Sequence, residues 1–138
     1  MTRSALLAVG VALAGSLASL AGTEPLCPDA ETTVEMNQCV RAKIEAAEAD
    51  LDRYLESARR AIDDDPASLA ALDRSQTAWT AFREAECAAV YERYRDGTIR
   101  GVMGGTCALQ LLRRRTHDLW STYLRTVDDS KLSEPEEP

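Results

Sequence analysis

The chain has 138 residues, which is enough for one domain and too few for two of ordinary size. Hydrophobic residues make up 45% of it, so a packed core is possible, while 23 acidic against 16 basic residues give a net charge of −7 with the single His neutral. This acidity argues against a nucleic-acid-binding protein, which needs clustered Lys and Arg, and no phosphate loop or glycine-rich strand-to-helix turn indicates a nucleotide cofactor.

Residues 1–21 have the features of a cleaved secretory signal peptide. Arg3 supplies the positive start, residues 5–20 are apolar, and residues 19–21 fit a small-x-small cleavage site. The apolar run of about 16 residues is shorter than the roughly 20 that a spanning helix needs, which favours a cleaved signal over an uncleaved anchor. Thr23 stands where a lipoprotein signal requires Cys. We therefore expect a periplasmic or secreted protein with no lipid anchor and no membrane span.

Residues 128–138 are expected to form a disordered acidic tail, because five acidic residues and one Lys leave little apolar surface to bury. Arg3 is the only charged residue of the signal segment, so residues 22–138 carry a net charge of −8, and half of this charge lies on the tail. The remaining domain, residues 22–127, has a moderately acidic surface that suits a cationic partner.

Thr32 and Glu35 have the spacing of a capping box, which predicts a helix start. The apolar residues that follow recur at helical spacing on one face. The helix is expected to end at residues 63–65, with Asp65 capping a second helix that begins at Pro66. The residues of the buried face are Thr33, Met36, Val40, Ile44, Ala47, Leu51, Tyr54, Leu55, Ala58 and Ile62.

The second predicted helix ends at Asp96-Gly97 and carries a narrow packing stripe with steps of three or four residues. The polar member Arg83 is expected to pair with a carboxylate or with helix-end carbonyls. Trp79 is expected to be a core residue, with Gln76 one turn away as the partner of its indole N–H. The stripe consists of Leu69, Leu72, Gln76, Trp79, Arg83, Cys87, Val90 and Tyr94.

The third helix is expected from near Thr106 to about Val127. Its main apolar face contains Leu109, Leu112, Leu119, Trp120, Tyr123 and Val127, and a second row contains Cys107, Leu111, Arg115 and Leu119. No strand pattern occurs after residue 22. Short connections between helices force neighbours to run antiparallel, so the expected fold is all-α: an elongated three-helix bundle with room for a short extra helical turn.

Four cysteines in an exported chain of this size indicate two disulfides. Because no Cys-x-x-Cys pair is present, a zinc site or a thioredoxin-like site is disfavoured. Three connectivities are possible, and we favour Cys27–Cys39 and Cys87–Cys107, since each closes a local loop. The single histidine, His117, has no second ligand at a suitable spacing, so no metal is expected.

Part of the second helix resembles the Gln, Trp, Arg and Cys series of the LprI-like lysozyme-inhibitor family: Gln76-x-x-Trp79-x-x-x-Arg83-x-x-x-Cys87. Further matches are Thr33-x-x-Met36-Asn37-x-Cys39 to the opening motif, Gly97-Thr98 to the Gly-Gly-Ser turn, and Cys107, Leu111, Arg115 and Leu119 to the last helix. The resemblance spans residues 27–119 and implies a small exported bacterial helical domain with paired cysteines. The chain departs from the family pattern at Asp52, Glu84, Asp96 and Leu112.

Residues 95–106 are expected to be a loop fastened by a disulfide, and they form the candidate partner-binding segment. The loop is interpreted as functional rather than as a plain connector because a connector has no need to expose apolar side chains. Arg100 could enter an acidic cleft such as the paired carboxylates of a lysozyme, and a disulfide would preorganise the segment. The candidate binding residues are Thr98, Ile99, Arg100, Val102 and Met103.

The sequence features predict a non-enzymatic exported protein that binds a protein partner. The resemblance to the LprI-like family implies that this partner is a lysozyme-type muramidase, which the protein blocks. No nucleophile is predicted beside the carboxylates of Glu84 and Glu86, so no enzyme and no cofactor is expected. The alternative is a structural or adaptor domain of the cell envelope that binds no lysozyme. The family-motif residues Gln76, Trp79, Arg83 and Arg115 are expected to be structural, and the oligomeric state stays open.

Overall fold

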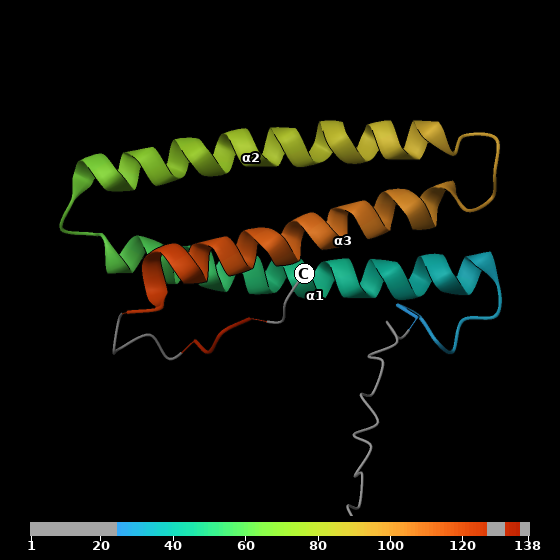
Figure 1. Ribbon diagram of the computed structural model, residues 1–138, viewed down its shortest axis with the longest axis horizontal. Helices are drawn as coiled ribbons and strands as arrows, with labels where there is room; N and C mark the ends of the chain where they lie inside the picture. Colours follow the sequence, from blue (N-terminus) through green and yellow to red (C-terminus); the bar gives the residue numbers. More distant parts are fainter. Residues whose placement is uncertain (1–24, 127–131, 136–138) are drawn as a thin grey trace, which may run out of the picture.

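The computed structural model describes residues 25–126 and 132–135. They form three long helices, α1 (Thr33–Ala61), α2 (Pro66–Arg93) and α3 (Arg100–Leu119), and α3 continues directly into a π-helical turn, η1 (Trp120–Leu124). Consecutive helices run antiparallel in an elongated bundle (Figure 1), and no strand occurs in the described part of the chain. The expected all-α bundle is confirmed. The segment expected to be a signal peptide lies outside the described residues.

Side-chain caps determine where the first two helices begin. The Thr32 hydroxyl accepts a hydrogen bond from the Glu35 backbone N–H, and the Glu35 carboxylate accepts one from the Thr32 N–H at 2.9 Å. The Asp65 carboxylate accepts bonds from backbone N–H groups in the first turn of α2. Each cap satisfies helix N–H groups that have no partner within the helix, so both starts lie where the sequence predicts them.

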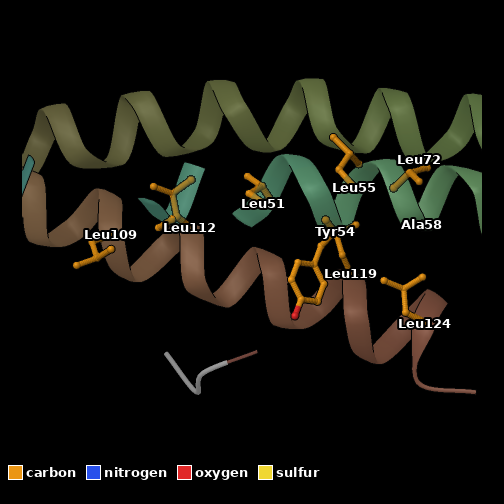
Figure 2. Close-up of a cluster of buried hydrophobic side chains, with 10 residues drawn as sticks. Leu51, Tyr54, Leu55, Ala58, Leu72, Leu109, Leu112, Leu119 and Leu124 are labelled. Atoms are coloured by element: carbon orange, nitrogen blue, oxygen red, sulfur yellow. The ribbon is translucent and has the colours of Figure 1, made fainter. Parts of the chain in front are cut away.

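The hydrophobic core is formed mainly by α1 and α3, and α3 packs against both of the other helices. Figure 2 shows the core side chains pointing into the space between the helices. Its buried residues are Ala47, Leu51, Tyr54, Leu55 and Ala58 of α1, Leu72 of α2, Leu109, Leu112 and Leu119 of α3, and Leu124 of η1. In α2, Leu72 is the single buried residue. The predicted packing stripe of α2 therefore faces the bundle but is otherwise only half-buried, and its last member, Tyr94, is exposed.

Polar side chains connect α2 to its neighbours. Arg83 forms an ion pair with Glu48 of α1 at 3.0 Å and its side chain is only 19% exposed, which confirms the expected carboxylate partner. Arg115 of α3 donates through Nε to the side-chain oxygen of Gln76 at 3.1 Å. The side-chain oxygen of Gln76 therefore accepts a hydrogen bond from Arg115. The sequence predicted that Gln76 would instead be the partner of the Trp79 indole N–H. The Trp79 ring packs beside the core with the Arg83 guanidinium over it, 5.4 Å from the ring centroid.

Residues 132–135 lie against the bundle, although the sequence predicts disorder for residues 128–138. The hydroxyl of the buried Tyr54 donates to the Ser133 carbonyl at 2.6 Å, and Leu132 packs against the core. A buried tyrosine hydroxyl needs a hydrogen-bond partner, and this segment supplies it. The other residues of the predicted tail lie outside the described residues.

Candidate protein-binding site at the disulfide end of the bundle

The glycine-rich segment after α2 is helical. Because α2 ends at Arg93 and α3 begins at Arg100, only residues 94–99 connect the two helices. The prediction of a loop over residues 95–106 and of a helix start near Thr106 is therefore wrong. Thr98 and Ile99 lie in the connection, whereas the other candidate binding residues, Arg100, Val102 and Met103, belong to the start of α3.

Close helix packing explains why these glycines are helical. A Cβ atom on Gly105 would lie 2.7 Å from Cγ1 of Val40 in α1, and one on Gly104 would lie 3.3 Å from Cβ of Tyr91 in α2. Glycine has a low intrinsic helix propensity, but here it lets α3 approach both other helices at once. These long-range contacts outweigh the local preference for a loop.

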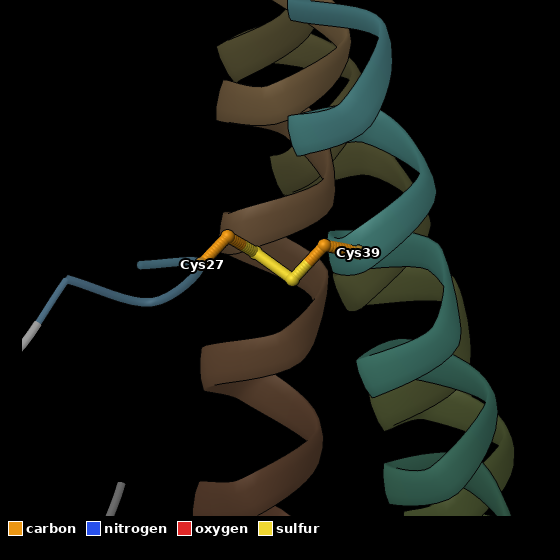
Figure 3. Close-up of a disulfide and its surroundings, with 2 residues drawn as sticks. All are labelled: Cys27 and Cys39. Atoms are coloured by element: carbon orange, nitrogen blue, oxygen red, sulfur yellow. A yellow bond between two sulfur atoms is a disulfide. The ribbon is translucent and has the colours of Figure 1, made fainter. Parts of the chain in front are cut away.

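Both disulfides lie toward this same end of the bundle. Cys27–Cys39 joins the segment before α1 to that helix, with the two Cα atoms 6.2 Å apart (Figure 3). Cys87–Cys107 joins the end of α2 to the start of α3, with 5.5 Å between the Cα atoms. Both pairings confirm the favoured connectivity. In the chain-entropy model each bridge contributes about 3 kcal/mol to stability for loops of this length by constraining the unfolded chain, so this end of the fold is covalently fastened.

Large apolar side chains are exposed at the disulfide end of the bundle. The start of α1, the end of α2 and the start of α3 meet there because the helices are antiparallel (Figure 1). Exposed apolar patches on a folded protein indicate interaction sites. We call the following residues the end patch: Val34, Tyr91, Tyr94, Ile99 and the adjacent cation Arg100.

Arg100 is the exposed cation of the end patch. Its guanidinium lies over the Tyr91 ring, 5.2 Å from the centroid, and Nη1 donates to the Arg95 carbonyl at 3.4 Å. No carboxylate in the described part of the chain forms an ion pair with it. Because its guanidinium lies on an aromatic ring and forms no ion pair there, Arg100 can bind an anionic group of a partner without first breaking an internal salt bridge.

A groove of about 530 Å³ lies beside the end patch, between all three helices. Its walls include Asn37, Val40, Arg41, Ile44, Tyr91 and Glu92, and the α3 glycines face it. A second hollow of about 460 Å³ shares Asn37 and Arg41 with the groove and extends to Val34. Sequence reasoning missed the contribution of α1 because it considered the connecting segment alone. The predicted antiparallel order of the helices could have revealed this contribution, because it places the start of α1 at the same end as the connection between α2 and α3.

The family-motif residues lie along the bundle and form contacts between helices. Gln76 bonds Arg115, Arg83 pairs with α1, and Trp79 packs against the core. Within residues 25–126 and 132–135, no group of three or more His, Cys, Asp or Glu side chains is placed to hold a metal ion. Over the same ranges, no helix is long and apolar enough to cross a membrane.

The chain was compared with protein-family models, with known proteins and with solved structures. Residues 27–119 match the family model described as lysozyme inhibitor LprI. The chain is also 28% identical over 107 residues to an uncharacterised protein of Rhizobium meliloti (strain 1021), a match that covers 70% of this chain and 77% of that protein. No solved structure matches the chain significantly.

Proposed function

Since this chain belongs to the LprI lysozyme-inhibitor family, we propose that it is an exported, non-enzymatic protein that binds a lysozyme-type muramidase and blocks it. The family match carries this proposal, because residues 27–119 include all three α-helices and both disulfides. The matched region therefore covers all three α-helices rather than one shared motif.

The end patch is the proposed inhibitory surface. A glycosidase cleaves its substrate between two carboxyl groups that flank the scissile bond, so a protruding element that carries a cation suits such a cleft. The narrow end of this elongated bundle protrudes, and Arg100 provides the cation. Disulfides and close helix packing hold the patch in place before binding, which lowers the entropy cost of association.

Export is part of the proposal and is supported by cysteine chemistry. Disulfides persist in oxidising compartments such as the periplasm and the extracellular space, and this chain forms two of them. Residues 1–21 are the proposed signal peptide. The net charge of −8 on residues 22–138 adds a long-range attraction toward a basic enzyme.

Calorimetric titration of purified residues 22–138 into several types of lysozyme tests the proposal. We expect a saturable complex at micromolar protein concentrations with at least one type, with the affinity reduced at high salt because part of the attraction is electrostatic. Absence of binding to every type would favour a structural or adaptor domain of the cell envelope instead.

A further inference from the structure

Helix α2 exposes apolar side chains on the face that points away from the bundle. It lies along one edge of the bundle, packed against α3 (Figure 1), and its inward positions include Leu72 and Arg83. The opposite face carries Phe82, whose side chain is 52% exposed. A helix that is apolar all round is normally buried on all sides, so this outer face lacks a partner within the bundle. The exposed alanines on it include Ala67, Ala71, Ala78, Ala81, Ala85 and Ala88.

These outward positions follow the spacing of a packing seam between two helices. From Ala67 to Glu92 they recur in alternating steps of four and three residues, which is the heptad spacing of helices that pack side by side. The six alanines occupy all but two of these positions, and the other two are Arg74 and Glu92. Both are exposed, and neither forms an ion pair with another side chain of residues 25–126 or 132–135. We call these eight positions the α2 seam: it is apolar, with one unpaired charge of each sign.

The α2 seam is complementary to itself when two copies run antiparallel. Arg74 and Glu92 each lie nine residues from position 83, on opposite sides of it. In a two-fold symmetric antiparallel pair, positions equally far from the centre face each other, so Arg74 of each copy faces Glu92 of the other. Within one molecule these two residues are about 27 Å apart along the helix, too far to pair with each other. The alanines that face each other in the same way are Ala78 with Ala88 and Ala81 with Ala85.

We propose that the outer face of α2 binds a second copy of this chain, with the two α2 helices antiparallel and with reciprocal ion pairs between Arg74 of each copy and Glu92 of the other. A parallel pair would place like charges opposite each other, which the charge pattern disfavours. Phe82 lies beside the two-fold axis, where the partner helix covers its exposed ring.

The size of the interface sets the strength of this dimer. One helix face from each copy lies at the small end of specific interfaces, so the dimer should dissociate at low micromolar concentrations, at which unfolding and lysozyme binding are measured. The contact runs along the side of the bundle rather than at the end patch. This inference therefore does not depend on lysozyme binding.

Sedimentation equilibrium of disulfide-bonded residues 22–138, from about 5 to 500 µM and at low salt, tests the proposal. We expect a monomer at the lowest concentration and a dimer at the highest. Arg74→Glu and Glu92→Arg each place like charges opposite each other in both pairs, so each should weaken dimerisation at least about fivefold. The combined variant has the wild-type net charge and recreates both pairs with the signs exchanged, so it should restore dimerisation. Glu86→Arg, the same charge change at an exposed position of α2 outside the seam, is the matched control and should dimerise like the wild-type chain.

Three results would overturn the proposal. The first is a wild-type chain that stays monomeric over the whole concentration range. The second is wild-type dimerisation by Ala85→Asp, which places a carboxylate opposite Ala81 of the other copy and should prevent the contact. The third is a combined Arg74→Glu and Glu92→Arg variant that dimerises no better than the two single variants, which would exclude the antiparallel pairing. All three substituted side chains are exposed, and circular dichroism checks that each variant keeps the helical fold.

Discussion

Arg100 is the residue whose proposed role is most specific. If it enters a lysozyme cleft, its charge is desolvated against carboxylates, and truncating one partner of such a pair typically costs about 2–5 kcal/mol. Arg100→Ala should therefore weaken lysozyme binding by at least about tenfold, measured by calorimetry. The melting temperature should stay at the wild-type value because this exposed side chain supports no core contact. Arg60→Ala, exposed at the far end of α1, is the control, and an Arg100→Ala protein with wild-type affinity would remove Arg100 from the mechanism.

Trp79 and Phe82 are close neighbours on α2 that differ in burial. Trp79 packs against the core, whereas Phe82 is 52% exposed. Trp79→Ala should cost about 2 kcal/mol, less than the 3–5 kcal/mol of a fully buried aromatic, because its ring is only half-buried. Phe82→Ala should change stability by about 0.5 kcal/mol or less. Urea unfolding measures both, and a Trp79→Ala variant with normal stability but no lysozyme binding would make Trp79 a binding residue.

The capping residue Glu35 makes stability depend on pH. Hydrogen bonds from the backbone N–H groups of Thr32 and Glu31 lower the pKa of Glu35. A carboxyl with a lowered pKa stabilises the fold above its unfolded pKa, near 4.3, and this contribution is lost as the pH falls through the folded value. Stability should therefore decline below about pH 4.5. Glu35→Gln keeps a capping bond but cannot ionise, so acid unfolding should become less steep.

The control for this pH effect is Glu45→Gln, which removes one exposed carboxylate from the middle of the same helix. Unfolding free energies from pH 3 to 7 give the slope for each protein, and this range spans the ordinary pKa of Glu. Equal slopes for Glu35→Gln and the wild-type chain would contradict the role of this carboxylate in the cap.

At the scale of elements, the start of α3 depends on how closely it approaches α1. Gly105→Ala would add a Cβ atom 2.7 Å from Cγ1 of the buried Val40. Although Ala favours a helix over Gly by about 1 kcal/mol, overpacking typically costs about 1–3 kcal/mol, and we expect a net loss of stability. Gly97→Ala, where the nearest atom would lie at 3.6 Å, should have little effect. Thermal unfolding compares the two, and a more stable Gly105→Ala protein would contradict the packing argument.

The helix starts show which parts of this fold local sequence can predict. Thr32 and Asp65 cap α1 and α2 through side chains within three residues of the N–H groups that they bind, so sequence spacing alone identifies them. The start of α3 has no side-chain cap. It is set by contacts of Gly104 and Gly105 with two other helices, which a local pattern does not contain. The local sequence pattern therefore predicts a loop over residues 95–106, which is longer than the observed connection.

At the scale of the whole molecule, one end of the bundle combines disulfides and close helix packing with exposed apolar surface. Both disulfides and the close-packed glycines lie toward it. The sequence predicted Ile99 and Arg100 as binding residues because a plain connector has no need to expose an apolar side chain and because a cation beside it suits an acidic cleft. It did not predict Val34 or Tyr91, since they belong to different helices and only antiparallel packing brings them to the same end.

Inhibition of cell-wall lysis tests the central claim most directly. Disulfide-bonded residues 22–138 are titrated into lysozymes of several types acting on a bacterial cell suspension, and turbidity is followed. We predict dose-dependent inhibition of at least one type, and weaker inhibition by Ile99→Asp, which places a charge in the end patch. Phe82→Asp, which changes an exposed apolar residue outside the patch, should inhibit like the wild-type chain. Undiminished lysis by every lysozyme type at micromolar excess of the folded wild-type protein would contradict the claim.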